Sequence, residues 1–299
     1  MDIGSPLNVN SQPSISTILK QIEDFRDAWL ATSRPIGIMV VRPGGNMGWK
    51  GLGVMLFAGL LPTWAEAQST NYAAWEKQRK LDEAAQVQAL VQSLKAAQPQ
   101  VRGAAPQTRP LGTVTSPSNK QTFQVSVVTE AEALALVQTL RKDPAIPFEY
   151  LQDGAYARAH TMVRNLEKAG IIAGKAWIEG KPPLCAFSEE FGEIKLDYHV
   201  APMILVGSQL ANTIQVLDPS LSLKPLSLTA WKALLTRRTQ AKVTETYFTP
   251  RFHYGPYEKA EAKTGYDEES IEDAIDSNDK FWQMLAFIRE QMKRDQKAN

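Results

Sequence analysis

The residues that could do chemistry lie in three separate segments of the chain. One contains Tyr198-His199-Val200-Ala201, and a second contains Asp218 directly before Pro219. A histidine and an aspartate that orients it are two thirds of a Cys-His-Asp site, in which the histidine keeps a cysteine deprotonated for nucleophilic attack. The pattern therefore directs attention to the place where a cysteine would stand.

The third segment, Asp153 to His160, is predicted to open a helix, and it contains alanine where a thiol would make chemical sense. Free N–H groups and the dipole at a helix N-terminus lower the pKa of a thiol, and they can also bind an oxyanion. Ala155 lies in the first turn of this helix, in that favourable position. Whether the protein is an enzyme depends on residue 155, and the sequence leaves that open.

The positions of the two polar residues fit such a site. Apolar residues alternate along the strand predicted before His199, so its side chain lies on the face opposite that of Ile194, Leu196, Tyr198 and Val200, together with Lys195, Asp197 and Ala201. Asp218 ends its own strand and can accept a hydrogen bond from an imidazole on a neighbouring strand. Taken singly, a histidine on a strand and an aspartate before proline are more often structural.

Few other residues compete for a chemical role. Cys185 is the one cysteine, and its apolar segment predicts a buried structural thiol rather than a substitute nucleophile. His160 and His253 are predicted to pack or to form hydrogen bonds. Three scattered histidines and one distant cysteine predict no metal site, and nothing in the sequence indicates a cofactor.

Arg158 has two interpretations. It could bind a substrate carboxylate, but an ion pair with Asp153 or Glu149 is the preferred prediction.

Composition excludes several classes of partner. Lys and Arg number 33 and Asp and Glu 32, so no overall field favours nucleic acid. The sequence has no run of 18 or more apolar residues, so we expect no stable insertion in a membrane.

Residues 47–67 have the order of a secretory signal peptide. Lys50 precedes an apolar core, Pro62 follows it, and Ala65-Glu66-Ala67 is an A-x-A cleavage pattern. We expect cleavage after Ala67 and a secreted or periplasmic protein. Residues 1–46 then form an unexplained N-terminal extension, for which a start at Met47 is one account. The competing interpretation of the apolar run is a buried core helix.

Residues 68–122 are predicted to be a helical pro-segment or linker that contacts the catalytic domain. Ala73 to Ala97 favours an amphipathic helix, whose apolar stripe includes Leu81, Val91 and Leu94. Residues 98–122 are rich in proline, glycine and polar residues, which is typical of a linker.

Residues 123–299 are predicted to form the globular domain. A strand over 123–128 is followed by a helix with the capping box Thr129-Glu130-Ala131-Glu132 and by the helix that ends before Gly170. Strands are expected over 171–178, 184–187, 194–206 and 213–217, with a break or bulge at Pro202-Met203. A helix over 229–237, strand-rich sequence over 243–254 and a helix over 268–297 complete an α+β domain.

Residues 146–235 resemble the bacterial protein-glutaminase family. The motifs that match are Asp153-Gly154, Tyr156-Ala157-Arg158-Ala159-His160, Tyr198-His199-Val200-Ala201, Asp218-Pro219-Ser220-Leu221 and Thr229-Ala230-Trp231. The resemblance implies a papain-like core, with an antiparallel sheet and a helix that bears the nucleophile. It also implies a secreted enzyme that hydrolyses the side-chain amide of protein-bound glutamine to glutamate and ammonia through a Cys-His-Asp triad, without a cofactor. Its substrate would be a protein or peptide with an exposed glutamine.

Carried over to this chain, the resemblance makes His199 the base, Asp218 its orienting group and Ala155 the nucleophile position. Since alanine cannot attack a carbonyl, we expect the chain to be inactive, and the intact motif favours a Cys-to-Ala variant. Two alternatives stay open, a natural pseudoenzyme that binds glutamine-containing proteins and a transglutaminase-like acyl transferase.

Overall fold

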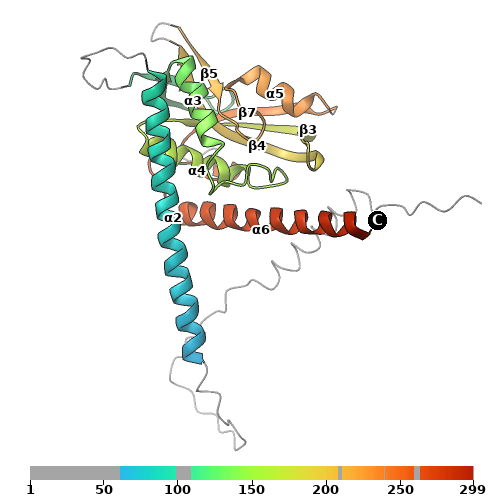
Figure 1. Ribbon diagram of the computed structural model, residues 1–299. Helices are drawn as coiled ribbons and strands as arrows, with labels where there is room; N and C mark the ends of the chain where they lie inside the picture. The colour runs from blue at the N-terminus through green and yellow to red at the C-terminus, as the bar shows by residue number, and fades with distance from the viewer. Residues whose placement is uncertain (1–60, 99–108, 208–210, 239, 259–262, 299) are drawn as a thin grey trace, which may run out of the picture. The chain divides into compact units, whose positions relative to one another are not determined.

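The computed structural model describes residues 61–98, 109–207, 211–238, 240–258 and 263–298 (Figure 1). The chain divides into two compact units, residues 1–63 and 64–299, and the described residues belong almost entirely to the second. The expected extension over 1–46 lies outside the described residues. So does the expected export signal over 47–67, apart from the helical backbone of its last seven positions.

A mixed, mostly antiparallel sheet forms the centre of the second unit. Its strands are β1 (Leu111–Thr115), β2 (Thr122–Val128), β3 (Gly174–Ser188), β4 (Gly192–Gly207), β5 (Asn212–Val216), β6 (Leu226–Ser227) and β7 (Lys242–Pro250). The order is β1-β2-β4-β3-β7, with β5 between β4 and β6, and only the β2–β4 pairing is parallel. The expected α+β class is confirmed.

Two strand predictions differ from the structure. The stretch 98–122 was expected to be a linker, but it contains β1, which pairs along its whole length with β2. Strands expected separately over 171–178 and 184–187 are one bent strand, β3, because its pairing with β4 resumes after a bulge between Glu179 and Leu184. Sequence pattern alone sees Gly180, Pro182 and Pro183 as a break, whereas pairing on both sides keeps the chain extended.

The helices confirm most of the predicted boundaries. They are α2 (Leu61–Ala97), α3 (Glu130–Leu140), α4 (Ala155–Lys168), α5 (Leu228–Thr236) and α6 (Glu268–Ala298), with a short 3-10 helix, η1, at Pro256–Glu258. Thr129 and Glu132 form the predicted capping box at the start of α3. The expected arrangement of a helix whose N-terminus lies beside an antiparallel sheet is present in α4.

α2 packs against the domain through fewer apolar residues than predicted. Leu90 and Leu94 are buried among α3, α4 and the sheet, whereas Leu81 is 55% exposed. Glu83 forms an ion pair with Lys168 at 2.5 Å, and Arg164 lies 3.7 Å from the same carboxylate. α2 is therefore attached to the C-terminal half of α4.

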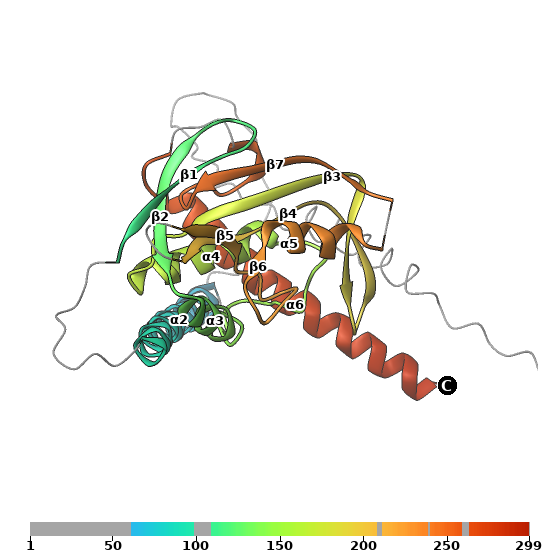
Figure 2. The ribbon, with the colours of Figure 1, turned by 90° about the horizontal axis from the view of Figure 1, so that it is seen from above.

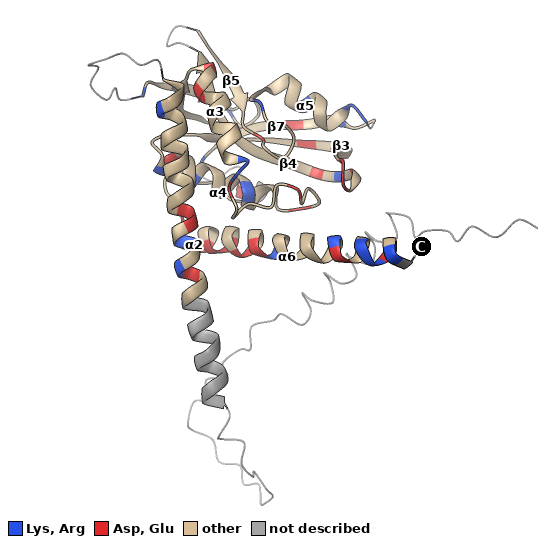
Figure 3. Ribbon diagram, in the orientation of Figure 1, with Lys and Arg blue, Asp and Glu red and all other residues tan. Residues whose placement is uncertain are grey.

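The N-terminal half of α6 packs on α4, and its last turns extend past the strands (Figure 2). Phe281 stacks on Tyr150 with ring centroids 5.0 Å apart, and Asn278 donates to Thr161 at 3.0 Å. Acidic side chains occupy the first half of α6 and basic ones its end (Figure 3), the order that the helix dipole favours. The segment that precedes α4 is thus held from outside by α6.

Gly154, the N-cap of α4, is the residue through which this packing can be tested. Its φ is +76°, and a Cβ placed there would overlap the Phe281 ring. Since the left-handed conformation costs an L-residue about 1–2 kcal/mol and overpacking about 1–3 kcal/mol, we expect Gly154→Ala to lower the free energy of unfolding by about 3 kcal/mol in urea titration.

Gly170→Ala is the matched control. Gly170 has a φ of +83°, and a Cβ placed there would contact nothing within 4 Å. Gly170→Ala should therefore lower the free energy of unfolding only by the cost of the left-handed conformation, about 1 kcal/mol. Equal losses in the two variants would show that contact with α6 does not constrain the start of α4.

Candidate active site

His199 and Asp218 form the centre of a buried polar group. The imidazole Nε2 of His199, on β4, lies 2.8 Å from Oδ2 of Asp218, which follows β5, and both residues are at most 2% exposed. The indole N–H of Trp231, on α5, donates to the same oxygen at 2.8 Å. The hydrogen bond expected between the two strands is therefore present, while the catalytic roles of its members stay predictions.

The surroundings of Asp218 keep it ionised. Burial alone would raise the pKa of this carboxyl, but His199, Trp231 and the charge of Arg158 together hold its pKa below the usual value. The backbone N–H of Ser220 donates to the other carboxylate oxygen at 3.2 Å, because the chain turns at Pro219. A buried carboxylate stays ionised only when both of its oxygens accept hydrogen bonds, as they do here.

The ionised carboxylate fixes the tautomer of His199. A carboxylate can only accept hydrogen bonds, so Nε2 of the imidazole must be the donor in their contact. In the neutral ring, Nδ1 then carries a lone pair. Among the described residues this buried Nδ1 has no hydrogen-bond partner, so the ring has one nitrogen with unused capacity to accept a proton.

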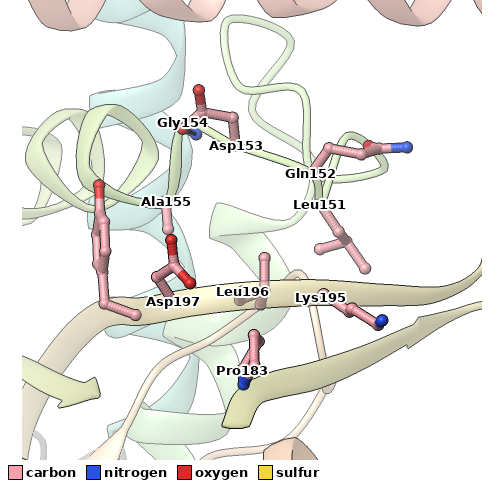
Figure 4. Close-up of a pocket in the computed structure, with 10 residues that line it drawn as sticks. Leu151, Gln152, Asp153, Gly154, Ala155, Pro183, Lys195, Leu196 and Asp197 are labelled. Carbon is pink, nitrogen blue, oxygen red and sulfur yellow. Dashed lines mark hydrogen bonds between the residues drawn. The ribbon is translucent and has the colours of Figure 1, made fainter. Parts of the chain in front are cut away.

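Ala155 is the first residue of α4 and lines a cavity of about 260 Å³. Gly154 provides no side-chain cap, and the first helical bond runs from Arg158 N–H to the Gly154 carbonyl at 3.0 Å. The N–H groups of the first turn consequently have no partner within the helix. Figure 4 shows the Ala155 methyl group at the cavity, opposite Leu196 and Asp197 of β4.

Two observations connect Ala155 with the polar group. Ala155 belongs to a buried cluster with Val200 and with the partly buried Tyr198, which flank His199 along β4 although their side chains lie on the other face of the strand. Arg158, one turn along α4, lies close enough to Asp218 for its charge to lower the pKa of that carboxyl. The structure thus brings the first turn of α4 to the part of β4 that carries His199.

Arg158 does not form the ion pair predicted from the sequence. Its guanidinium is buried and donates to the backbone carbonyls of Tyr150 at 2.6 Å and Asp153 at 2.7 Å. Glu149 instead pairs with Arg141 at 2.7 Å. Carbonyl oxygens of the turn before α4 lie nearer than any carboxylate of the described residues, so Arg158 fixes the backbone that leads to Ala155.

The expected break at Pro202-Met203 is also wrong. β4 continues to Gly207, and Pro202 stays in register opposite Lys175. The Pro202 carbonyl accepts from Leu217 N–H at 2.8 Å. Because a residue's N–H and C=O point to the same side of a strand, the missing N–H of Pro202 falls on this side, where β5 ends, and removes no bond to β3.

The other cysteine and histidine predictions are confirmed. Cys185 is buried in β3, and burial raises the pKa of its thiol. Nδ1 of His160 lies 2.9 Å from the ammonium of Lys175, which also donates to the backbone carbonyl of His253. Burial holds the pKa of Lys175 well below its usual value. These groups lie inside the core and line no part of the cavity.

The described residues contain no group of three or more His, Cys, Asp or Glu side chains that could hold a metal ion. Within the same residues, no helix has the length and apolarity needed to span a membrane.

Sequence reasoning assigned no role to two residues of this site. Trp231 lies in a motif that the resemblance includes, but only the structure shows its indole bound to Asp218. Asp197 lines the cavity together with Lys195, Leu196 and Tyr198, which come from both faces of the strand, so strand alternation gave no signal for it.

Removing the indole donor should make Asp218 easier to protonate. Trp231→Phe deletes a hydrogen bond to a buried charge, so we expect it to lower the free energy of unfolding by about 2–3 kcal/mol at pH 7. The lowered pKa of Asp218 stabilises the fold above the unfolded-state pKa, and this stability is lost as the pH falls through the folded-state pKa. The acid transition of the variant should therefore begin at higher pH.

Trp177→Phe is the control for ring size. Trp177 is as deeply buried as Trp231, but its indole donates at 2.9 Å to the neutral hydroxyl of Thr249. Loss of this hydrogen bond should lower the free energy of unfolding by about 1 kcal/mol, in addition to the loss of packing that both variants share. The pH of the acid transition should not change. Identical acid shifts in both variants would contradict the role given to Trp231.

Comparisons with known proteins found one family model and several solved structures that are similar to part of this chain. Residues 131–235 match the family model described as glutaminase. A comparison with curated proteins found no match. A crystal structure of protein-glutaminase is 25% identical, with a TM-score of 0.43, and the match covers 52% of this chain and 90% of that chain.

Two further solved structures are similar. The NMR structure of protein-glutaminase from Chryseobacterium proteolyticum is 26% identical, with a TM-score of 0.41, over 50% of this chain and 85% of that chain. A crystal structure of pro-protein-glutaminase is 23% identical, with a TM-score of 0.42, over 58% of this chain and 62% of that chain. The residues that match the glutaminase family model, 131–235, are about a third of this chain and include α4, His199 and Asp218.

Proposed function

We propose that this domain has the site of a protein-glutamine deamidase and lacks only its nucleophile. The observation that carries the proposal is the His199–Asp218 pair, whose buried Nδ1 is without a partner among the described residues. A base that is oriented and desolvated, yet bound to nothing on its reactive side, is what a nearby thiol would complete.

Each residue of the site has a role in the proposed reaction. A cysteine at position 155 would transfer its proton to Nδ1 of His199, and the thiolate would attack Cδ of a glutamine side chain. N–H groups in the first turn of α4 would bind the oxyanion. His199 would then return the proton to the leaving ammonia, and a water molecule activated by the same imidazole would hydrolyse the thioester to glutamate.

Ala155 prevents this reaction in the chain as it stands. A methyl group has no lone pair, and loss of a nucleophile from a catalytic triad lowers kcat by a factor on the order of 10⁶. The expected behaviour is binding of a glutamine side chain without turnover. The proposal covers two origins of Ala155, an introduced Cys-to-Ala change and a natural pseudoenzyme.

A second part of the proposal concerns residues 68–122. Because β1 belongs to the sheet, we assign only the helical part, residues 68–97, to a pro-segment, supported by the burial of Leu90 and Leu94 against α3 and α4. The contacts of α2 lie at the C-terminal half of α4, which has 14 residues and is therefore about 20 Å long. This described part of the segment is attached away from Ala155 and supports the domain without filling the cavity. Export through residues 47–67 remains a prediction.

Ala155→Cys tests the proposal directly. We expect the variant to release ammonia from a protein that contains exposed glutamines, at a rate the unchanged chain does not approach. Mass spectrometry of the substrate should show conversion of glutamine to glutamate, a gain of about 1 Da for each site. Adding a primary amine distinguishes a transglutaminase, which would attach the amine instead.

The double variant Ala155→Cys/His199→Gln is the matched control, because it keeps the thiol and removes the base. Loss of a general base costs about 10²–10⁴-fold, so its ammonia release should fall by that factor. A folded Ala155→Cys protein that releases no ammonia and modifies no amine would refute the deamidase site.

A further inference from the structure

The cavity beside Ala155 contains a carboxylate that the proposed reaction does not use. Asp197 lies two residues before His199 on β4, is exposed, and lines the cavity together with Ala155. Figure 4 shows its carboxylate directed towards the Ala155 methyl group. The side chain therefore lies where a reacting group attached to residue 155 would meet its substrate.

The other charged groups of the cavity are arranged differently. Asp153 points away from Ala155, and its Oδ1 accepts from the N–H of Gly154 at 2.6 Å (Figure 4). Lys195 extends away along the strand. Asp197 has no hydrogen-bond or ion-pair partner among the described residues, so both of its oxygens are available to a ligand.

The chemistry of a carboxamide determines what Asp197 can bind. The reacting carbon must approach the nucleophile to about 3–3.5 Å, so the amide of a bound glutamine lies at the mouth of the cavity. Its oxygen suits the N–H groups at the start of α4, which leaves its NH₂ group, a donor of two hydrogen bonds, in need of an acceptor. The cavity has an acceptor at this place in Asp197.

We propose that Asp197 accepts a hydrogen bond from the side-chain NH₂ of the glutamine and thereby selects glutamine over glutamate. This inference rests on the proposed function. The product carboxylate has no N–H to donate and carries the same charge as Asp197, so it is repelled. One residue thus favours binding of the substrate and release of the product.

The size and walls of the cavity agree with one side chain as its ligand. Its volume of about 260 Å³ is below the range of about 300–1,000 Å³ that is typical of drug-sized ligands. Leu151, Pro183 and Leu196 line it with apolar groups that can contact the methylene groups of a glutamine. Asp197 is then a specificity-determining residue and takes no part in bond breaking.

Binding to the full unchanged chain tests the inference, because Ala155 prevents turnover. The probes are a capped tripeptide with a central glutamine and its glutamate counterpart, titrated by NMR at pH 7. A charge-assisted hydrogen bond predicts that the glutamine peptide binds about tenfold more tightly. In Asp197→Asn the glutamate peptide should bind more tightly, and the ratio of the glutamine-peptide affinity to the glutamate-peptide affinity should approach one. A misfolded protein would not gain affinity.

Lys195→Gln is the matched control on the same strand face. Its ammonium attracts glutamate, so its removal should raise the ratio, opposite to the effect of Asp197→Asn. Equal affinities in the unchanged chain, or the same ratio in Asp197→Asn, would overturn the inference. If Ala155→Cys nevertheless releases ammonia, only the role of Asp197 fails. If neither peptide binds and Ala155→Cys is inactive, the proposed function fails as well.

Discussion

The buried guanidinium of Arg158 is the one charged group that acts on both parts of the described site. It binds the carbonyls of Tyr150 and Asp153 and so fixes the turn that leads into α4. Its charge also lowers the pKa of Asp218. A single cation inside the protein therefore connects the start of the helix with the histidine–aspartate pair, two parts of the chain that are far apart in sequence. Displacing it would leave buried carbonyls without donors.

The hydrogen bonds to Asp218 are complete without a nucleophile. His199, Trp231 and the backbone N–H of Ser220 together satisfy the carboxylate, so its geometry does not require a thiol at position 155. A buried carboxylate with donors for both oxygens holds one arrangement, because each alternative leaves it unpaired, and this leaves only Nδ1 of His199 in the pair without a partner among the described residues. This explains how a chain with Ala155 can keep an imidazole oriented for chemistry that it does not perform.

Local sequence determined the helices and most strands, and long-range contacts determined the exceptions. The capping box at Thr129 and the end of α4 at Gly170 follow from residues within one turn, so they could be predicted. β1 depends on pairing with β2, and the course of β4 through Pro202 depends on where β5 ends.

The site shows the same division. His199, Asp218 and position 155 could be found from residue type and motif. The role of Trp231 and the carbonyl partners of Arg158 required coordinates, because their contacts join segments that no local pattern connects. The exposure of Leu81 likewise could not be predicted from the helical pattern, which does not show which turns of α2 have a neighbour.

The attachments of α4 have a mechanical consequence. Its first turn is fixed by Arg158 and by the contact of Gly154 with Phe281, and its last turns are fixed by ion pairs to Glu83 on α2. The two attachments lie at opposite ends of a helix of 14 residues, about 20 Å apart. Loss of α2 would therefore remove ion pairs from the far end of α4 and leave the hydrogen bonds of Arg158 in place.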